Sequence, residues 1–155
     1  MNAPLHKEIP AGVLDDARAL AQASAQWDDD IVGQLKAYIE IPAKSPSFDA
    51  GWAEHGYLDS VARNAAAWVE AQAVEGLRLE LVRLEGRTPV LFFEVPATRA
   101  ESTQTVLMYG HLDKQPEFTG WRKDLGPWTA KYEDGKLYGR GGADDGYAVY
   151  ASIAA

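Results

Sequence analysis

The chain has 155 residues, 46% apolar and 25% charged, a composition typical of one ordinary globular domain with a hydrophobic core. Its 23 acidic and 15 basic residues give a formal net charge of -8, which argues against nucleic acid or an anionic membrane surface as a partner, because both attract a surplus of Lys and Arg. The chain has no cysteine, which excludes disulfides, thiolate zinc sites and cysteine nucleophiles.

The N-terminal residues 1–12 predict a loose lead-in, because Pro4, Pro10 and Gly12 interrupt any regular pattern. They contain no apolar segment of the kind found in secretory signals. No stretch of the chain approaches the roughly 20 apolar residues that span a bilayer. We therefore expect a cytoplasmic protein without a membrane partner.

Helical patterns fill the next part of the chain. Residues 13–27 carry apolar side chains at helical spacing, and residues 28–41 do so again, with Asp28 to Asp30 suited to the start of a second helix. Residues 42–47 contain two prolines and two serines and predict a loop. A third helix is expected from about Leu58 to Val74, before Gly76 as a stop signal.

The pattern then changes to that of strands. Residues 77–85 alternate between apolar and polar side chains, and residues 89–95 and 105–110 are short apolar runs. Residues 114–134 predict an ordered loop, and residues 136–142 a short strand that ends in glycines. A last helix is expected to begin at Asp144 or Asp145. These elements predict an α/β fold, a mixed sheet with flanking helices.

The first candidate for a functional site is Gly110-His111-Leu112-Asp113, at the end of the predicted buried strand 105–110. Ligands of open α/β sheets gather at the carboxyl ends of strands. His111 and Asp113 are two residues apart on an extended segment and should point to the same side, where a carboxylate can orient a metal-bound imidazole. Alone the pattern is a weak signal, and a histidine hydrogen-bonded at a strand end explains it equally well.

The second candidate is the segment 139–145, Gly-Arg-Gly-Gly-Ala-Asp-Asp. Two explanations of its paired aspartates remain open. Asp144 caps a helix and Asp145 lies in its first turn, or Asp144 coordinates a metal ion around which the glycines let the backbone fold closely. Phosphate binding is disfavoured, because the Lys-Ser/Thr of a P-loop is missing and paired aspartates repel phosphate.

Taken together, residues 105–150 resemble the metal-binding region of the M20 family of metallopeptidases, and most closely its carnosinase-like, nonspecific dipeptidase branch. The family pattern is a strand ending in His-x-Asp-x-x-Pro, a Trp, a Pro-aromatic pair, Asp-Gly-Lys-Leu-Tyr-Gly-Arg-Gly and an Asp-Asp pair. Pro116, Trp121, Pro127-Trp128 and residues 134–145 fill those places in order. The likeness is diffuse over residues 1–75.

The resemblance implies an α/β catalytic domain with a two-zinc site, for which Mn2+ or Co2+ are alternatives. It makes His111 a ligand of one zinc ion, Asp144 a carboxylate that bridges both ions, and Asp113 the catalytic-site carboxylate that holds His111. Asp145 would be structural, joined to Asp144 by a cis peptide bond. Two such cations share a water, lower its pKa and polarise the scissile carbonyl, and a bridging carboxylate offsets their mutual repulsion.

Two positions depart from the family pattern. Asp144 and Asp145 are followed by Gly146-Tyr147 instead of Lys-Gly, and Lys114 occupies the place of a small apolar residue. Neither departure removes a ligand, and both bear on the subfamily and its substrate. The remaining histidines, His55 before the third helix and His6 in the lead-in, are expected to be surface or capping histidines.

The resemblance implies hydrolysis of dipeptides or short peptides, with an N-acyl-amino-acid deacylase as the alternative because the same metals serve both. In the family, later Glu, Asp and His residues complete the site, and an inserted lid domain supplies substrate contacts and homodimerisation. The chain stops at Ala155 inside an apolar helical pattern without a polar cap. We therefore expect residues 1–155 to be the N-terminal part of a catalytic domain, truncated before the lid and, as a fragment, inactive.

Overall fold

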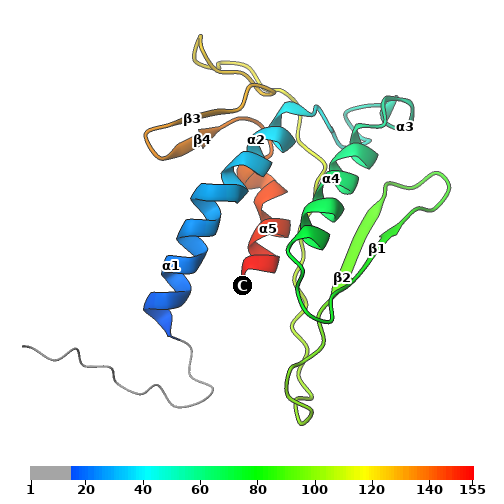
Figure 1. Cartoon of the computed structure of the whole chain (residues 1–155). Helices are drawn as coiled ribbons and strands as arrows, with labels where there is room; N and C mark the ends of the chain where they lie inside the picture. Colours follow the sequence, from blue (N-terminus) through cyan, green and yellow to red (C-terminus); the bar gives the residue numbers. More distant parts are fainter. Residues whose placement is uncertain (1–14) are drawn as a thin grey trace, which may run out of the picture.

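The computed structural model describes residues 15–155, and the predicted lead-in at residues 1–12, with His6, lies outside them (Figure 1). The helices are α1 (Asp16–Gln26), α2 (Val32–Glu40), α3 (Trp52–His55), α4 (Tyr57–Ala71) and α5 (Tyr147–Ala154). The π-helical turn η1 (Trp27–Ile31) joins α1 to α2, and the turn η2 (Gly142–Gly146) precedes α5. The strands are β1 (Arg78–Val82), β2 (Val90–Glu94), β3 (Lys131–Glu133) and β4 (Lys136–Tyr138).

The first helical segment begins at a side-chain cap and continues without a break into α2. Asp15 accepts a hydrogen bond from the Arg18 backbone N–H at 3.1 Å, as a helix N-cap does. The separate second start predicted at Asp28 to Asp30 is wrong, because the backbone keeps helical angles on both sides of η1. Asp30 instead accepts a hydrogen bond from the Trp68 indole at 2.7 Å.

The hydrophobic core lies between α2, α4 and α5, which Figure 1 shows side by side. Leu35 and Ile39 of α2 are four residues apart and therefore lie on the same face of that helix. Both are almost completely buried, as is Val69 of α4. The Trp68 ring meets the Tyr150 ring of α5 edge to face, with 4.8 Å between the centroids. The helix predicted from Leu58 to Val74 is confirmed as α4, which spans Tyr57–Ala71.

The strands form two separate antiparallel pairs, β1 with β2 and β3 with β4. In the first pair, Leu79 lies opposite Phe93 and Leu81 opposite Leu91. These four side chains are half-buried, whereas their neighbours along each strand are mostly exposed, so the inner face of the hairpin packs against α4. The mixture of helices and strands confirms the predicted α/β class, and β3 and α3 add short elements that the pattern had not indicated.

The strand predicted at residues 105–110 is wrong for the part of the chain that the structure describes. This segment has no strand partner between residues 15 and 155, and Val106 and Leu107 are 83% and 90% exposed. A strand needs a neighbour for its backbone hydrogen bonds and a surface to cover its apolar side chains. The sequence pattern indicates an apolar segment, but it does not show whether a neighbouring strand or a covering surface is present.

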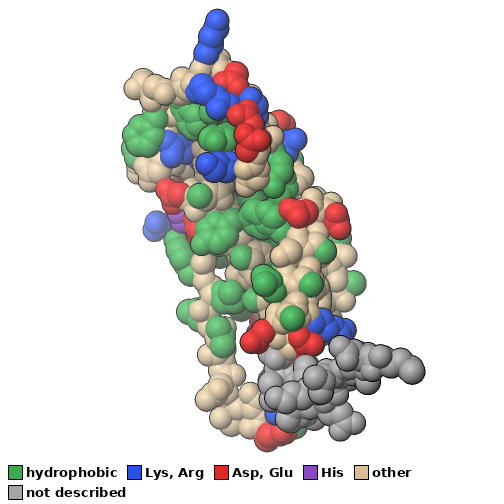
Figure 2. Space-filling model, turned by 90° about the vertical axis from the view of Figure 1, so that its left-hand side faces the viewer, with side chains coloured by type: hydrophobic (Ala, Val, Ile, Leu, Met, Phe, Trp, Pro, Cys, Tyr) green, Lys and Arg blue, Asp and Glu red, His purple; other side chains and the backbone are tan. Residues whose placement is uncertain are grey.

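Charged side chains gather at one end of the face shown in Figure 2, on the side where β3 and β4 lie. Arg122 donates hydrogen bonds to Asp124 at 2.6 Å and to Glu133 at 3.0 Å, and Lys131 pairs with both carboxylates. These pairs link the long loop after Pro116 to the β3–β4 hairpin.

None of the helices described between residues 15 and 155 is long and apolar enough to cross a bilayer.

Candidate metal centre

The three residues predicted to form the site lie together, although Asp144 is distant in sequence from the other two. His111 Nε2 lies 3.2 Å from Asp144 Oδ1. On the other side of the ring, His111 Nδ1 lies 3.2 Å from Asp113 Oδ1 and 3.0 Å from the Asp113 carbonyl oxygen. Two acceptors at Nδ1 favour the tautomer that carries its proton there, which leaves the Nε2 lone pair directed toward Asp144.

The separation between His111 Nε2 and Asp144 Oδ1 fits two ligands of one ion. Zinc binds His nitrogen and carboxylate oxygen at about 2.0–2.2 Å, and ligands at a tetrahedral angle are then about 3.3 Å apart. The observed separation is 3.2 Å. The donor set, an imidazole with carboxylates, also suits zinc and related divalent cations.

The surrounding carboxylates control the protonation of His111. Partial burial lowers the pKa of this imidazole, but the carbonyl and carboxylate of Asp113 and the carboxylates of Asp145 and Asp144 outweigh it, so the pKa of His111 lies above its usual value. Zinc binds only the deprotonated Nε2, so metal binding competes with the protonation that these carboxylates favour.

The segment that carries His111 is held from two sides. The Tyr38 hydroxyl of α2 donates a hydrogen bond to the Leu112 carbonyl at 3.1 Å, and the His111 backbone N–H donates to Asp145 Oδ2 at 3.2 Å. Burial, followed by nearby carboxylates such as Asp113, raises the pKa of Tyr38, so its hydroxyl remains a donor. The ring of His111 is thus placed by backbone contacts on both sides of residue 111.

Asp144 lies in a non-helical turn rather than at a helix start. Its φ and ψ are -126° and 89°, those of Asp145 are -134° and 22°, and the peptide bond between them is cis. Helix α5 begins only at Tyr147, so the predicted helix start at Asp144 or Asp145 is wrong, and neither carboxylate caps α5. The Asp144 side chain is 62% exposed, which leaves its carboxylate accessible to a ligand.

The glycines around Asp144 allow the backbone to approach α2. A Cβ at Gly146 would lie 2.2 Å from the Tyr38 ring, and one at Gly141 would lie 2.8 Å from Cγ of Lys114. Gly141 also has a φ of 91°, a conformation that favours glycine. Close packing against α2 and Lys114 therefore accounts for these two glycines without an ion or a phosphate.

Lys114 is a residue of this site that the sequence reasoning missed. Its side chain is 1% exposed, and its Nζ donates to the carbonyls of Tyr38, Ile39 and Ile41 at 2.6, 3.2 and 2.6 Å. Burial lowers the pKa of Lys114 to about 7, whereas carbonyls at a helix C-terminus favour the charged form. In the sequence, the one indication of a special role for Lys114 was that it replaces the small apolar residue of the family pattern.

The candidate centre is a partial ligand set. No group of three His, Cys, Asp or Glu side chains is arranged to hold a metal ion anywhere in residues 15–155. His55 lies at the surface, with a side chain 51% exposed and Nδ1 2.8 Å from Asp49. Among the described residues Asp49 is the one carboxylate paired with the His55 ring, as expected for a surface histidine.

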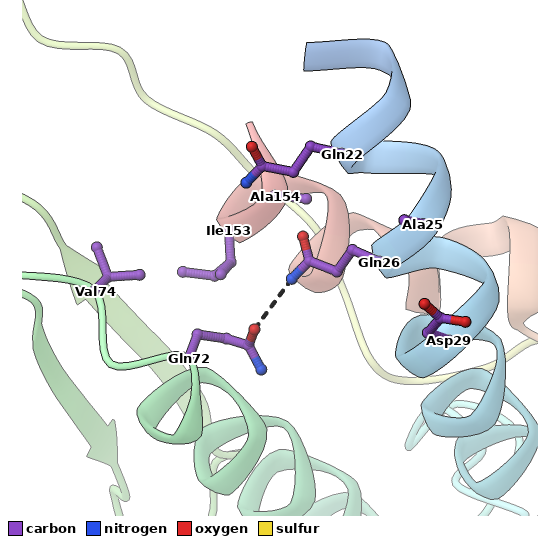
Figure 3. A pocket seen from close by; sticks show the side chains of 8 residues that line it. All are labelled: Gln22, Ala25, Gln26, Asp29, Gln72, Val74, Ile153 and Ala154. Carbon is purple, nitrogen blue, oxygen red and sulfur yellow. Dashed lines mark hydrogen bonds between the residues drawn. The ribbon is translucent and has the colours of Figure 1, made fainter. Parts of the chain in front are cut away.

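A pocket of about 440 Å³ lies elsewhere, between α1, the end of α4 and α5 (Figure 3). Gln26 donates a hydrogen bond to Gln72 at 3.0 Å across it. The lining side chains are Gln22, Ala25, Gln26, Asp29, Gln72, Val74, Ile153 and Ala154. Because Asp29 is the only ionisable group among them, the pocket has no arrangement suited to hydrolysis, and it includes none of the candidate site residues.

The candidate centre lies in the part of the chain that is similar to a known protein family. Residues 107–155 match the model of peptidase family M20/M25/M40. The resemblance to the M20 family is confirmed. The matched M20 segment contains His111, Asp113 and Asp144, so the residues that the structure brings together come from the part of the chain that carries the family likeness.

Three similar proteins share one name, Beta-Ala-His dipeptidase. The mouse protein is 44% identical over 67 residues, which is 42% of this chain and 13% of the relative. The human protein is 42% identical over 67 residues, 42% of this chain and 12% of the relative. The rat protein is 49% identical over 51 residues, 32% of this chain and 10% of the relative. The aligned part of the chain is thus a small fraction of each relative's length.

Proposed function

We propose that this chain is the N-terminal part of a catalytic domain that hydrolyses dipeptides or short peptides with a zinc-activated water. The observation that carries the proposal is the 3.2 Å separation between His111 Nε2 and Asp144 Oδ1, within a segment that matches a peptidase family. The convergence of a nitrogen and an oxygen donor at a ligand-like distance is what a metal-dependent hydrolase requires.

The residues of the chain would have distinct tasks. His111 offers Nε2 as a ligand, and Asp113 holds the proton on Nδ1 and thereby fixes the ring. Asp144 supplies negative charge that offsets the repulsion of closely spaced cations. When bound, the metal ions lower the pKa of a water and polarise the scissile carbonyl. Mn2+ or Co2+ would suit the same donors.

The proposal requires further ligands and a general base from other parts of the protein. The described residues bring together two candidate ligands, whereas a catalytic zinc has about three protein ligands. We therefore propose that the 155-residue chain by itself binds zinc weakly and is inactive, and that the full-length protein, alone or as a homodimer, completes the site.

The relatives favour a dipeptide over an N-acyl amino acid as the substrate. The mouse, rat and human relatives are all named for cleavage of a dipeptide, β-alanyl-histidine. The deacylase alternative uses the same metal chemistry and therefore serves as the contrast in the test.

The test is an assay of the full-length protein after removal of metal by a chelator. We expect no hydrolysis without metal, recovery on addition of zinc, and faster cleavage of β-alanyl-histidine than of N-acetyl amino acids. Hydrolysis that survives complete metal removal would contradict the zinc mechanism. Faster cleavage of N-acetyl amino acids would replace the dipeptidase with the deacylase.

A further inference from the structure

Lys114 is the only buried charged side chain among residues 15–155, and it directly follows Asp113 of the candidate centre. Its backbone is fixed on both sides by the chain after α2. The Lys114 N–H donates to the Ala43 carbonyl at 2.9 Å, and the Lys114 carbonyl accepts from the Ser45 N–H at 3.0 Å. The segment that carries His111 is therefore fastened at residue 114.

The ammonium of Lys114 is held at the C-terminal end of α2. It donates to the carbonyls of Tyr38, Ile39 and Ile41 and lies 3.9 Å from the centroid of the Tyr38 ring. The last carbonyls of a helix lack intrahelical partners and attract a cation. A Lys ammonium has three donors, so this arrangement uses all of them, and no carboxylate of the described residues forms an ion pair with it.

The methylene chain of Lys114 contacts the second half of the candidate centre. At Gly141, an added Cβ would meet three methylene carbons of Lys114 at 2.8 to 3.0 Å, so the backbone of residue 141 lies directly on this side chain. The Gly146 N–H donates to the Gly141 carbonyl at 2.8 Å and closes the turn that carries Asp144. One side chain thus touches both α2 and the turn of Asp144.

We propose that Lys114 is a positioning residue for the candidate metal centre. Its backbone continues the segment of His111, its ammonium fixes that segment to the end of α2, and its methylene chain supports the turn of Asp144. Together these contacts maintain the short separation between His111 and Asp144. Lys114 acts through these two residues without touching substrate or ion, and its part in hydrolysis rests on the function proposed above.

The decisive variant is Lys114→Met, which retains most of the side-chain volume but removes the ammonium, so the Ile39 carbonyl loses its Lys114 donor and the Tyr38 and Ile41 carbonyls keep only backbone N–H donors. Lys44→Met is the matched control. Lys44 pairs with Lys114 in a backbone bridge, but its own ammonium binds Glu117 at 2.8 Å near the surface. Val69→Ala, in the core on α4, controls for a general loss of stability.

The first readout is zinc affinity and kinetics of the full-length protein, at a temperature where circular dichroism shows each variant folded. We expect Lys114→Met to lower zinc affinity and kcat by about tenfold or more, as loss of residues that orient metal ligands does, with KM nearly unchanged. Lys44→Met and Val69→Ala should remain near wild type. Wild-type affinity and kcat in Lys114→Met, or an equal loss in Val69→Ala, would overturn the positioning role.

The second readout is independent of metal and separates this inference from the proposed function. In the metal-free protein, the backbone amide of Gly146 should exchange about tenfold faster or more in Lys114→Met, because its partner Gly141 loses support, and at the wild-type rate in Lys44→Met. An unchanged Gly146 rate in Lys114→Met would overturn the inference. If the wild-type protein neither binds zinc nor cleaves peptides, the proposed function fails, whereas this exchange rate still decides the role of Lys114.

Discussion

At the scale of single residues, two His–Asp pairs in this chain show how the surroundings of a histidine decide its use. His55 contacts Asp49 at 2.8 Å and is half-exposed at the surface. His111 also contacts an aspartate through Nδ1, but Asp144 lies on the opposite side of its ring. In a typical metal site one nitrogen of the imidazole faces the ion and a second ligand, and a carboxylate at the other nitrogen orients the ring. His111 has this arrangement and His55 does not, so His111 is the candidate ligand.

Substitution of these two histidines tests the difference directly. His111→Ala should lower zinc affinity of the full-length protein by about 100-fold or more, because loss of a ligand costs at least as much as loss of its outer-shell partner. His55→Ala removes the same side chain from the surface pair and should leave affinity unchanged. Calorimetric zinc titration measures both, and equal effects in the two variants would remove His111 from the site.

The raised pKa of His111 sets a pH dependence for metal binding. Zinc requires the neutral ring, so its affinity should fall as the pH drops through the pKa of His111, which lies above the usual value of 6.5. The stability of the metal-free protein has the opposite pH dependence. The raised pKa of His111 stabilises the fold fully below about pH 6.5, and this stabilisation is lost as the pH rises through the pKa of His111 in the folded protein. A titration of His111 by NMR that gives a pKa below 6.5 would contradict this.

The sequence revealed the residues with chemical motifs but not the residues that position them. His111, Asp113 and Asp144 belong to local patterns that can be read along the chain. Tyr38 and Lys114 act through backbone carbonyls far away in sequence. Because every residue offers a carbonyl, no pattern of side chains announces such a contact, and only the fold shows it.

At the scale of elements, the end of α2 and the turn η2 fit together because the turn lacks side chains at the contact. Gly146 has φ and ψ of -54° and -28°, which any residue adopts, so its glycine is needed for space. The Tyr38 ring occupies the position that a Cβ would take. The contact orders Asp144 by packing rather than by an unusual backbone angle at Gly146.

Two glycine substitutions separate space from backbone freedom. Gly146→Ala should destabilise the protein by about 1–3 kcal/mol, the cost typical of overpacking. Gly33→Ala, within α2 and with no atom within 4 Å of the added Cβ, should stabilise it by about 0.5–1 kcal/mol because alanine favours a helix. Chemical denaturation measures both changes, and a stable Gly146→Ala variant would show that Tyr38 moves aside without cost.

Elements with a long and regular pattern could be predicted, as could the short strand β4 before its glycines, whereas β3 and the state of residues 105–110 could not. The apolar face of α4 and the alternation in β1 each repeat several times, so local spacing was sufficient. The three residues of β3 are too few for any period. Residues 105–110 are apolar enough for a strand, but a strand is defined by its neighbour, and the sequence pattern does not say which segment that is.

At the scale of the whole molecule, α2 connects the hydrophobic core to the candidate centre. Leu35 and Ile39 face the core, while Tyr38 and the last carbonyls of the helix hold Leu112 and Lys114. The geometry at His111 and Asp144 therefore depends on a well-packed helix rather than on loops alone, and binding of an ion there should be coupled to the stability of the fold.

That coupling can be measured as a zinc-dependent shift in thermal unfolding of the full-length protein. A ligand bound only by the folded state adds about 2.7 kcal/mol at a concentration 100-fold above its dissociation constant, so the melting temperature should rise with zinc. The rise should be absent in His111→Ala and retained in His55→Ala. A similar rise in both variants would place the bound zinc elsewhere.

The most direct test is the position of zinc in crystals of the zinc-loaded full-length protein, located by anomalous scattering at the zinc edge. We expect a peak within about 2.0–2.2 Å of both His111 Nε2 and an Asp144 carboxylate oxygen. Fully occupied zinc peaks that touch neither side chain would contradict the central claim that these two residues hold the same ion.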